Sequence, residues 1–141
     1  MKNLLNIIIL SALLLTNCSF GEGKCVFYLD GVEKIFDSYG KMVNSITCES
    51  RNSNETLTIV IGGDIIEGAQ FFDTEFGGNM TIAYSDGDNE YNSSPNGLAY
   101  LKIDKISTGG DLIRGHFNGQ LKTSSTSSTV EITDGLFVSD R

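Results

Sequence analysis

Two stretches near the carboxyl end alternate apolar and polar residues with a period of two, and this alternation constrains the fold more than any other feature. They are residues 99–106 and 112–121. Such alternation is typical of β-strands that bury one face. No segment of ten or more residues after the first hydrophobic run keeps a helical period. The chain is therefore predicted to be all-β.

Turn residues divide the rest of the chain into further short runs. These strand-like runs are 24–29, 32–36, 43–48, 55–61, 80–84, 129–133 and 136–138. The pair Asp30-Gly31 favours the positive φ angles of a two-residue turn, so the first two runs are predicted to form a hairpin. Short strands at close spacing predict an antiparallel β-sandwich or open barrel of about seven to nine strands.

Two glycine positions near the carboxyl end give more local predictions. Gly115, ahead of Phe117, indicates a strand bend or a close approach of another backbone. The triplet 133–135 (Thr-Asp-Gly) is predicted to be a tight turn that returns the final strand beside its neighbour. The core is then expected to include Phe117, Leu121, Ile132 and Phe137.

The amino-terminal end has the layout of a secretory signal. Lys2 precedes an apolar run over residues 4–15, and a cysteine follows at position 18. A spanning helix needs about 20 apolar residues, so this run is too short to cross a bilayer and suits a signal peptide. The small segment 19–23 then separates Cys18 from the first predicted strand.

Leu15, Thr16 and Cys18 resemble the lipobox of bacterial lipoproteins, although Asn17 departs from the small residue usual before the cysteine. The resemblance implies a signal peptide over 1–17, a lipidated tether over 18–23 and a single β-domain over 24–141. It also implies that the lipid on Cys18 holds the protein at the bacterial cell envelope, in the outer membrane. The alternative is an ordinary secreted protein with a cysteine near its cleavage site.

The carboxyl-terminal third carries a second resemblance. Residues 97–103, 113–119 and 130–137 are similar to uncharacterised β-rich putative lipoproteins best known from Bacteroidetes. Those families have no assigned catalytic residues. The resemblance therefore implies only a β-domain on a lipid tether.

The charge balance excludes one class of partner. Without residues 1–17 the chain keeps 9 of its 10 Lys and Arg against 18 Asp and Glu, a formal charge of −9. An acidic surface repels nucleic acid, and no basic run is present, so nucleic-acid binding is not expected.

The remaining cysteines, Cys25 and Cys48, form an even pair in an exported chain and are predicted to form a disulfide. The bridge would close a loop of 24 residues and stabilise the domain by about 3 kcal/mol. Two free, buried thiols are the alternative. With two cysteines and one histidine available, neither a zinc site nor any other cofactor is expected.

Candidate chemistry is sparse. His116 is the only histidine, and strand alternation places it on the face opposite Phe117, toward solvent. Asp86, Asp88 and Glu90 lie in one polar loop, which is interpreted first as a solvated hairpin loop; the alternative is a Ca²⁺ site, because the loop offers the oxygen ligands that Ca²⁺ prefers. No catalytic constellation is evident, so the protein is predicted not to be an enzyme.

Exposed aromatic residues would mark a binding surface. The candidates are Phe71, Phe72, Phe76, Tyr84, Tyr91 and Tyr100. In a strand, Phe71 and Phe72 must face opposite sides, so one of them is expected outside the core. The leading hypothesis is a non-enzymatic envelope lipoprotein whose β-domain binds a protein or a glycan. The alternatives are a structural or assembly component of the envelope without a soluble ligand, and a small carbohydrate-active module.

Overall fold

The computed structural model describes residues 23–42, 44–74, 76–94, 97–123 and 128–140, and these residues form ten β-strands. The strands are β1 (Lys24–Leu29), β2 (Val32–Met42), β3 (Ser45–Glu49), β4 (Thr56–Ile61), β5 (Gln70–Asp73), β6 (Met80–Ser85), β7 (Glu90–Asn92), β8 (Leu98–Ile106), β9 (Leu112–Thr123) and β10 (Thr129–Asp140). None of the described residues belongs to a helix long and apolar enough to cross a membrane.

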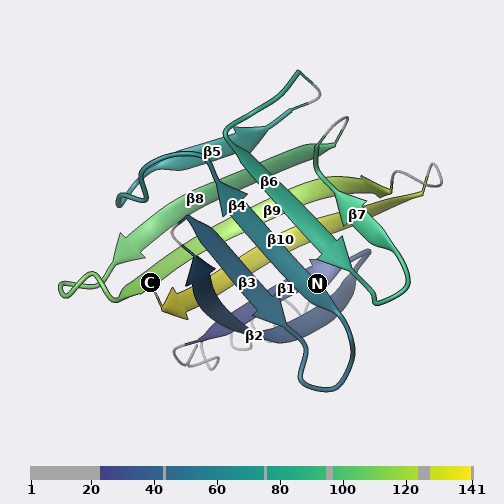
Figure 1. The fold of residues 1–141 in the computed structure, drawn as a ribbon, viewed down its shortest axis with the longest axis horizontal. Helices are drawn as coiled ribbons and strands as arrows, with labels where there is room; N and C mark the ends of the chain where they lie inside the picture. Colours follow the sequence, from purple (N-terminus) through teal and green to yellow (C-terminus); the bar gives the residue numbers. More distant parts are fainter. Residues whose placement is uncertain (1–22, 43, 75, 95–96, 124–127, 141) are drawn as a thin grey trace, which may run out of the picture.

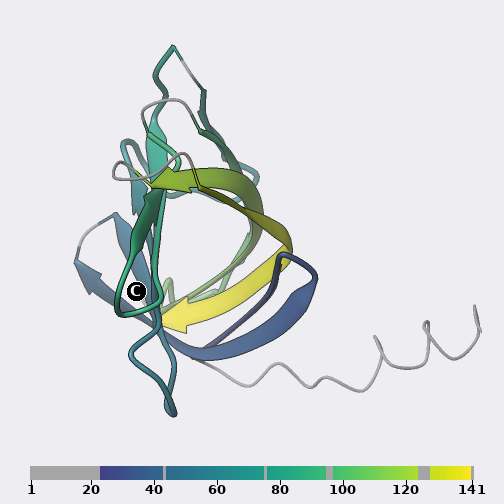
Figure 2. The ribbon, with the colours of Figure 1, turned by 90° about the vertical axis from the view of Figure 1, so that its right-hand side faces the viewer.

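The strands form one antiparallel sheet that closes on itself. Its order is β10-β1-β2-β3-β4-β6-β7-β9-β8-β5, and β10 also pairs with β9. Eight strands therefore complete a barrel, and β8 and β5 extend the sheet outward from β9. In Figure 1 the layer of β3, β4 and β6 crosses in front of β8, β9 and β10, and Figure 2 shows the sheet curving round to close.

Strand alternation separates the interior from the exterior, as the sequence predicts. On β4, Leu57, Ile59 and Ile61 are buried while Val60 faces out. Phe27, Phe117 and Phe137 meet inside the barrel, with ring centroids 6.1 Å apart for the first two and 6.3 Å for the last two. An eight-stranded barrel is just wide enough for such side chains to fill it.

The final strand corrects one prediction. The triplet 133–135 is not a turn, because β10 runs without a break from Thr129 to Asp140. Instead the register with β9 shifts between Ile132 and Gly135, and Asp134 has a φ of 50°. This is a β-bulge, which bends the strand without reversing it. A glycine is needed at 135 because a Cβ there would lie 2.7 Å from the ring and carbonyl of Phe117.

The all-β, antiparallel prediction is confirmed, and so is the first hairpin, in which Asp30 and Gly31 have φ angles of 49° and 80°. The barrel is closed rather than open, and the described residues contain ten strands, more than the seven to nine expected. The two strands that no alternation marked are β5 and β7, which are only four and three residues long.

A buried polar contact joins the extension to the barrel. Ser93, just after β7, donates from Oγ to Oδ2 of Asp73 at 2.6 Å, and the same Oγ accepts the backbone N–H of Ile82 at 2.9 Å. Both polar residues are almost fully buried. Because this contact links β5, β6 and the end of β7, it fixes the place where the outer strands leave the barrel.

Candidate functional site

The outer face of the extension and of the adjoining strand β9 carries a row of partly exposed rings, here called the aromatic row: Phe72 on β5, Tyr100 on β8 and His116 on β9. The ring centroids are 5.2 Å apart for Phe72 and Tyr100 and 5.8 Å apart for Tyr100 and His116. Phe72 is 48% exposed, whereas its neighbour Phe71 is buried. The prediction that one of these two phenylalanines lies outside the core is therefore confirmed.

The register between β5, β8 and β9 places the three rings of the aromatic row side by side. Phe72 pairs with Tyr100, and Tyr100 pairs with Asn118, while Lys102 pairs with both Gln70 and His116. Neighbouring strands lie about 4.8 Å apart, which sets the spacing of the rings. The rings are tilted by 50° and 46° to one another. The result is a stepped apolar platform on an otherwise polar face.

Polar side chains border this platform on each strand. Gln70 and Asn118 are exposed and Lys102 is half-buried. Each side-chain amide supplies hydrogen-bond donors and an acceptor, and the lysine ammonium group supplies donors. An apolar platform edged by such groups suits a ligand with an apolar face and a hydroxylated rim.

Asp104 orients the histidine of the row. Its two carboxylate oxygens lie 3.0 and 2.9 Å from Nδ1 of His116. An ionised carboxylate only accepts, so Nδ1 carries the proton and Nε2 of the neutral ring is left as an acceptor. Among the described residues no hydroxyl is hydrogen-bonded to Nε2. The prediction that His116 faces outward is confirmed, with 38% of its side chain exposed.

A second polar cluster lies inside one end of the barrel, and sequence reasoning did not find it. Oε1 of Glu55 accepts from Nζ of Lys34 and from the hydroxyl of Tyr84, each at 2.5 Å. Oε2 accepts from the hydroxyl of Ser53 at 2.8 Å. Burial raises the pKa of Glu55, but these hydrogen bonds outweigh it and hold the pKa below its usual value. Burial and the contact with Glu55 raise the pKa of Tyr84.

The loop proposed for calcium is closed by its own hydrogen bonds. Oδ1 of Asp86 accepts the backbone N–H groups of Asp88 and Asn89 at 2.9 and 2.7 Å. These bonds lower the pKa of Asp86. Across the described part of the chain, no three His, Cys, Asp or Glu side chains gather into a metal-binding group. Asp86, Asp88 and Glu90 are therefore not brought together as a calcium site.

Cys25 and Cys48 are free thiols in the structure, and both are fully buried. Burial, more than the neighbouring thiol of Cys48, raises the pKa of Cys25 well above its usual value. The two residues lie on β1 and β3 with β2 between them, and no disulfide joins them. The structure therefore does not contain the predicted bridge.

The other predicted aromatic residues are dispersed. Tyr84 is buried, and Tyr91 packs on it from β7 with ring centroids 6.1 Å apart. Phe76 is 92% exposed in the turn after β5, outside the aromatic row. Cys18, with the predicted signal peptide and most of the tether, lies outside the described residues.

No protein-family model, curated protein or solved structure matches this chain.

Proposed function

We propose that this protein is a non-enzymatic lipoprotein of the bacterial cell envelope that binds a glycan on the aromatic row. The observation that carries the proposal is the set of three rings, 5.2 and 5.8 Å apart, exposed on one sheet face and bordered by hydrogen-bonding side chains. Exposed apolar patches with polar edges mark binding surfaces. The lipid anchor on Cys18 and the envelope location rest on the lipobox-like sequence.

A glycan suits this surface better than an apolar protein segment. A pyranose presents C–H groups on its face and hydroxyls around its edge. The face packs on Phe72 and Tyr100, and the hydroxyls meet donors and acceptors on Gln70, Lys102 and Asn118. The platform runs across three strands, so it accommodates several consecutive sugars of a chain.

The test is retention of the isolated protein on insoluble polysaccharides: cellulose, chitin, xylan and purified peptidoglycan. Phe72→Ala and Tyr100→Ala should each weaken binding by about 2 kcal/mol, roughly thirtyfold, because each removes the packing of one ring. Phe76→Ala is the matched control, since it removes an exposed phenylalanine outside the row. The proposal fails if none of these polysaccharides retains the protein, or if Phe76→Ala weakens binding as much as Phe72→Ala.

The proposed lipid anchor on Cys18 can be tested separately by mass spectrometry. The intact mass of the protein extracted from membranes should exceed that of residues 18–141 by a diacylglyceryl group and any further acyl chain. Cys18→Ser should abolish the added mass. An unmodified thiol on the mature wild-type chain would refute the anchor and leave a secreted β-domain.

A further inference from the structure

Four cations line the end of the barrel at which the first strand begins. Lys105 on β8 pairs with Arg114 on β9, Arg114 pairs with Val138 on β10, and Val138 pairs with Lys24 on β1. Arg51 joins the row through Asp37, whose carboxylate also accepts from Lys24 at 2.6 Å. The set of Lys105, Arg114, Lys24 and Arg51 is here called the basic row.

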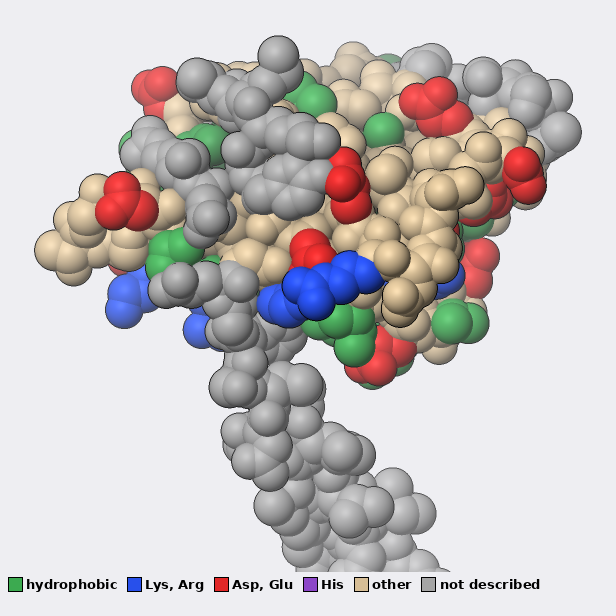
Figure 3. All heavy atoms as spheres, turned by 60° about the horizontal axis from the view of Figure 1, so that its bottom comes forward, with side chains coloured by type: hydrophobic (Ala, Val, Ile, Leu, Met, Phe, Trp, Pro, Cys, Tyr) green, Lys and Arg blue, Asp and Glu red, His purple; other side chains and the backbone are tan. Residues whose placement is uncertain are grey.

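The basic row remains positive after its internal pairing. Asp37 is shared by Lys24 and Arg51, whose hydrogen bonds lower its pKa, with Arg51 the larger cause. No described residue forms an ion pair with Lys105 or Arg114. Glu49 on β3 pairs with Asp37 at the end of the same row. Four cations therefore stand with two carboxylates, which leaves two net positive charges on a chain whose formal charge after residue 17 is −9. Figure 3, a view of this end, shows the basic side chains along one band with hydrophobic and acidic side chains beside them.

Apolar side chains occupy the next row of the same outer face. Leu136 on β10 pairs with Val26 on β1, and Val26 pairs with Ile35 on β2. Ile35 is 61% exposed. Cations next to exposed aliphatic groups form a surface that suits the boundary between lipid headgroups and acyl chains.

The tether fixes which end of the barrel meets the lipid. Only five residues, 19–23, separate Cys18 from Lys24. Fully extended, this segment holds the Cα of Lys24 within about 20 Å of that of Cys18. From Lys24 the basic row extends three strand spacings, about 14 Å, to Lys105 on one side, and two spacings, about 10 Å, to the end of β3 on the other. Both parts lie within the same reach.

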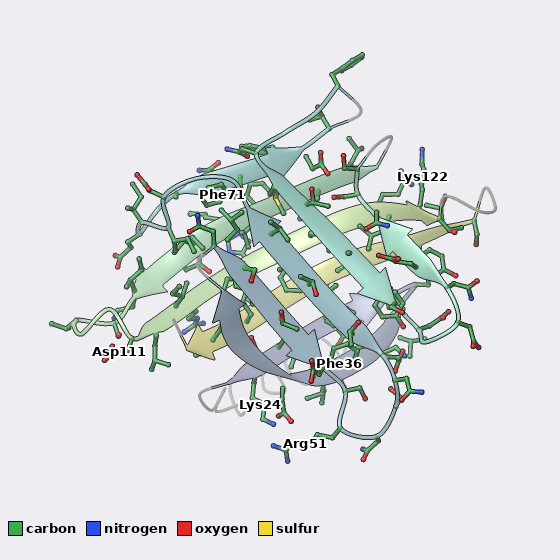
Figure 4. All side chains as sticks on the ribbon, in the orientation of Figure 1. Lys24, Phe36, Arg51, Phe71, Asp111 and Lys122 are labelled. Atoms are coloured by element: carbon green, nitrogen blue, oxygen red, sulfur yellow. The ribbon has the colours of Figure 1, made fainter. Side chains whose placement is uncertain are left out.

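We infer that the basic row docks the barrel onto an anionic lipid surface, so that this end of the barrel faces the membrane. The inference rests on the proposed anchor at Cys18. Each cation near an anionic surface favours docking by about 1 kcal/mol, or roughly fivefold. Figure 4 places Lys24 and Arg51 together, with Lys122 at the opposite end of the barrel.

The test uses the full lipidated protein in vesicles of phosphatidylcholine alone and of equimolar phosphatidylglycerol and phosphatidylcholine. An amine-acylating reagent reports the accessibility of each lysine by peptide mass. Lys24 and Lys105 should react several-fold more slowly in the anionic vesicles, while Lys122 reacts equally in both. About 1 M salt, at which the Debye length is near 3 Å, should remove the difference.

Charge reversal separates docking from a local effect on lysine reactivity. Arg114→Glu removes one cation and adds one anion, so docking should weaken by about 25-fold and the protection of Lys24 and Lys105 should disappear. Lys122→Glu changes the net charge equally and should leave that protection in place.

Two failures are distinguishable. If the protein does not float with vesicles of either composition, the anchor is wrong and the inference falls with it. If it floats with both, yet Lys24 and Lys105 react at the same rate in both, the anchor stands and the docking inference alone is overturned. Equal loss of protection in Arg114→Glu and Lys122→Glu would also overturn it.

Discussion

Gly115→Ala should destabilise the barrel although it adds only one methyl group. Gly115 lies on the inner face of β9, where β8 and the ring of Phe137 approach most closely. A Cβ at this position would lie 2.5 Å from the carbonyl oxygen of Lys102 and 2.7 Å from Cζ of Phe137. Real Cβ atoms do not approach so closely, so both neighbours would have to move.

The loss of stability in Gly115→Ala depends on how far the Lys102 carbonyl and the Phe137 ring can move away from the new methyl group. The Lys102 carbonyl belongs to the β8–β9 ladder, and Phe137 is fully buried among other core side chains. Overpacking a dense core costs about 1–3 kcal/mol, and a rigid backbone neighbour places Gly115→Ala at the upper end, about 3 kcal/mol. For a domain of this length that corresponds to a fall in Tm of about 10–15 °C.

Thermal unfolding followed by circular dichroism measures this directly, with Gly63→Ala as control. A Cβ at Gly63 would lie 3.5 Å from Cε1 of Phe71, an ordinary contact, so Gly63→Ala should leave Tm unchanged or raise it slightly. Phe137→Leu in the Gly115→Ala background removes one of the two clashes, so the double variant should be more stable than the summed single effects predict. A Gly115→Ala protein that melts with the wild type would refute the close approach of these strands.

Three further variants test other parts of the molecule. The pKa of Glu55 is lowered in the folded state, so its hydrogen bonds, such as that from the Tyr84 hydroxyl, stabilise the fold above about pH 4.5 and are lost as the pH falls through the folded-state pKa. Glu55→Gln should therefore flatten the acid side of a plot of Tm against pH. An unchanged slope would contradict this reasoning. Ser93→Ala leaves the buried carboxylate of Asp73 without its donor and should cost about 1–3 kcal/mol in urea unfolding, whereas Ser94→Ala, at an exposed position, should cost almost nothing. Alkylation of the unfolded protein without reductant should modify both Cys25 and Cys48, which a mass measurement would show. If both cysteines stay unmodified and the mass is lower by two hydrogens, the disulfide is present instead.

Local patterns predicted the parts of the fold that depend on neighbouring residues. The period-two alternation correctly assigned Leu57, Ile59 and Ile61 to the core and His116 to the exterior, because side-chain direction in a strand depends only on parity. The close approach expected at Gly115 is also present. The Thr-Asp-Gly triplet 133–135 misled because a bulge and a tight turn both use positive φ angles.

Features that depend on distant residues were not predictable in the same way. Barrel closure requires β1 to pair with β10, and no local pattern records that pairing. The polar cluster around Glu55 likewise joins residues from three separate strands or loops. The aromatic row was partly predictable from the sequence. Parity placed His116 on an outward face, but the pairing of β8 with β9 and of β5 with β8, which brings Tyr100 and Phe72 beside it, was not predicted.

The pairing of β1 with β10 also determines when the barrel can form. The side chain of Asp30 accepts the backbone N–H of Glu131 at 2.7 Å, across 101 residues of sequence. Contacts of such long range slow folding, because closing the long loop between the two residues costs conformational entropy before the contact contributes. The first strand to emerge from a ribosome or an export channel therefore keeps one edge unpaired until the last strand arrives. If the proposed signal peptide exports the chain, this delay would leave the polypeptide unfolded during its passage through the membrane, and the barrel would close on the far side.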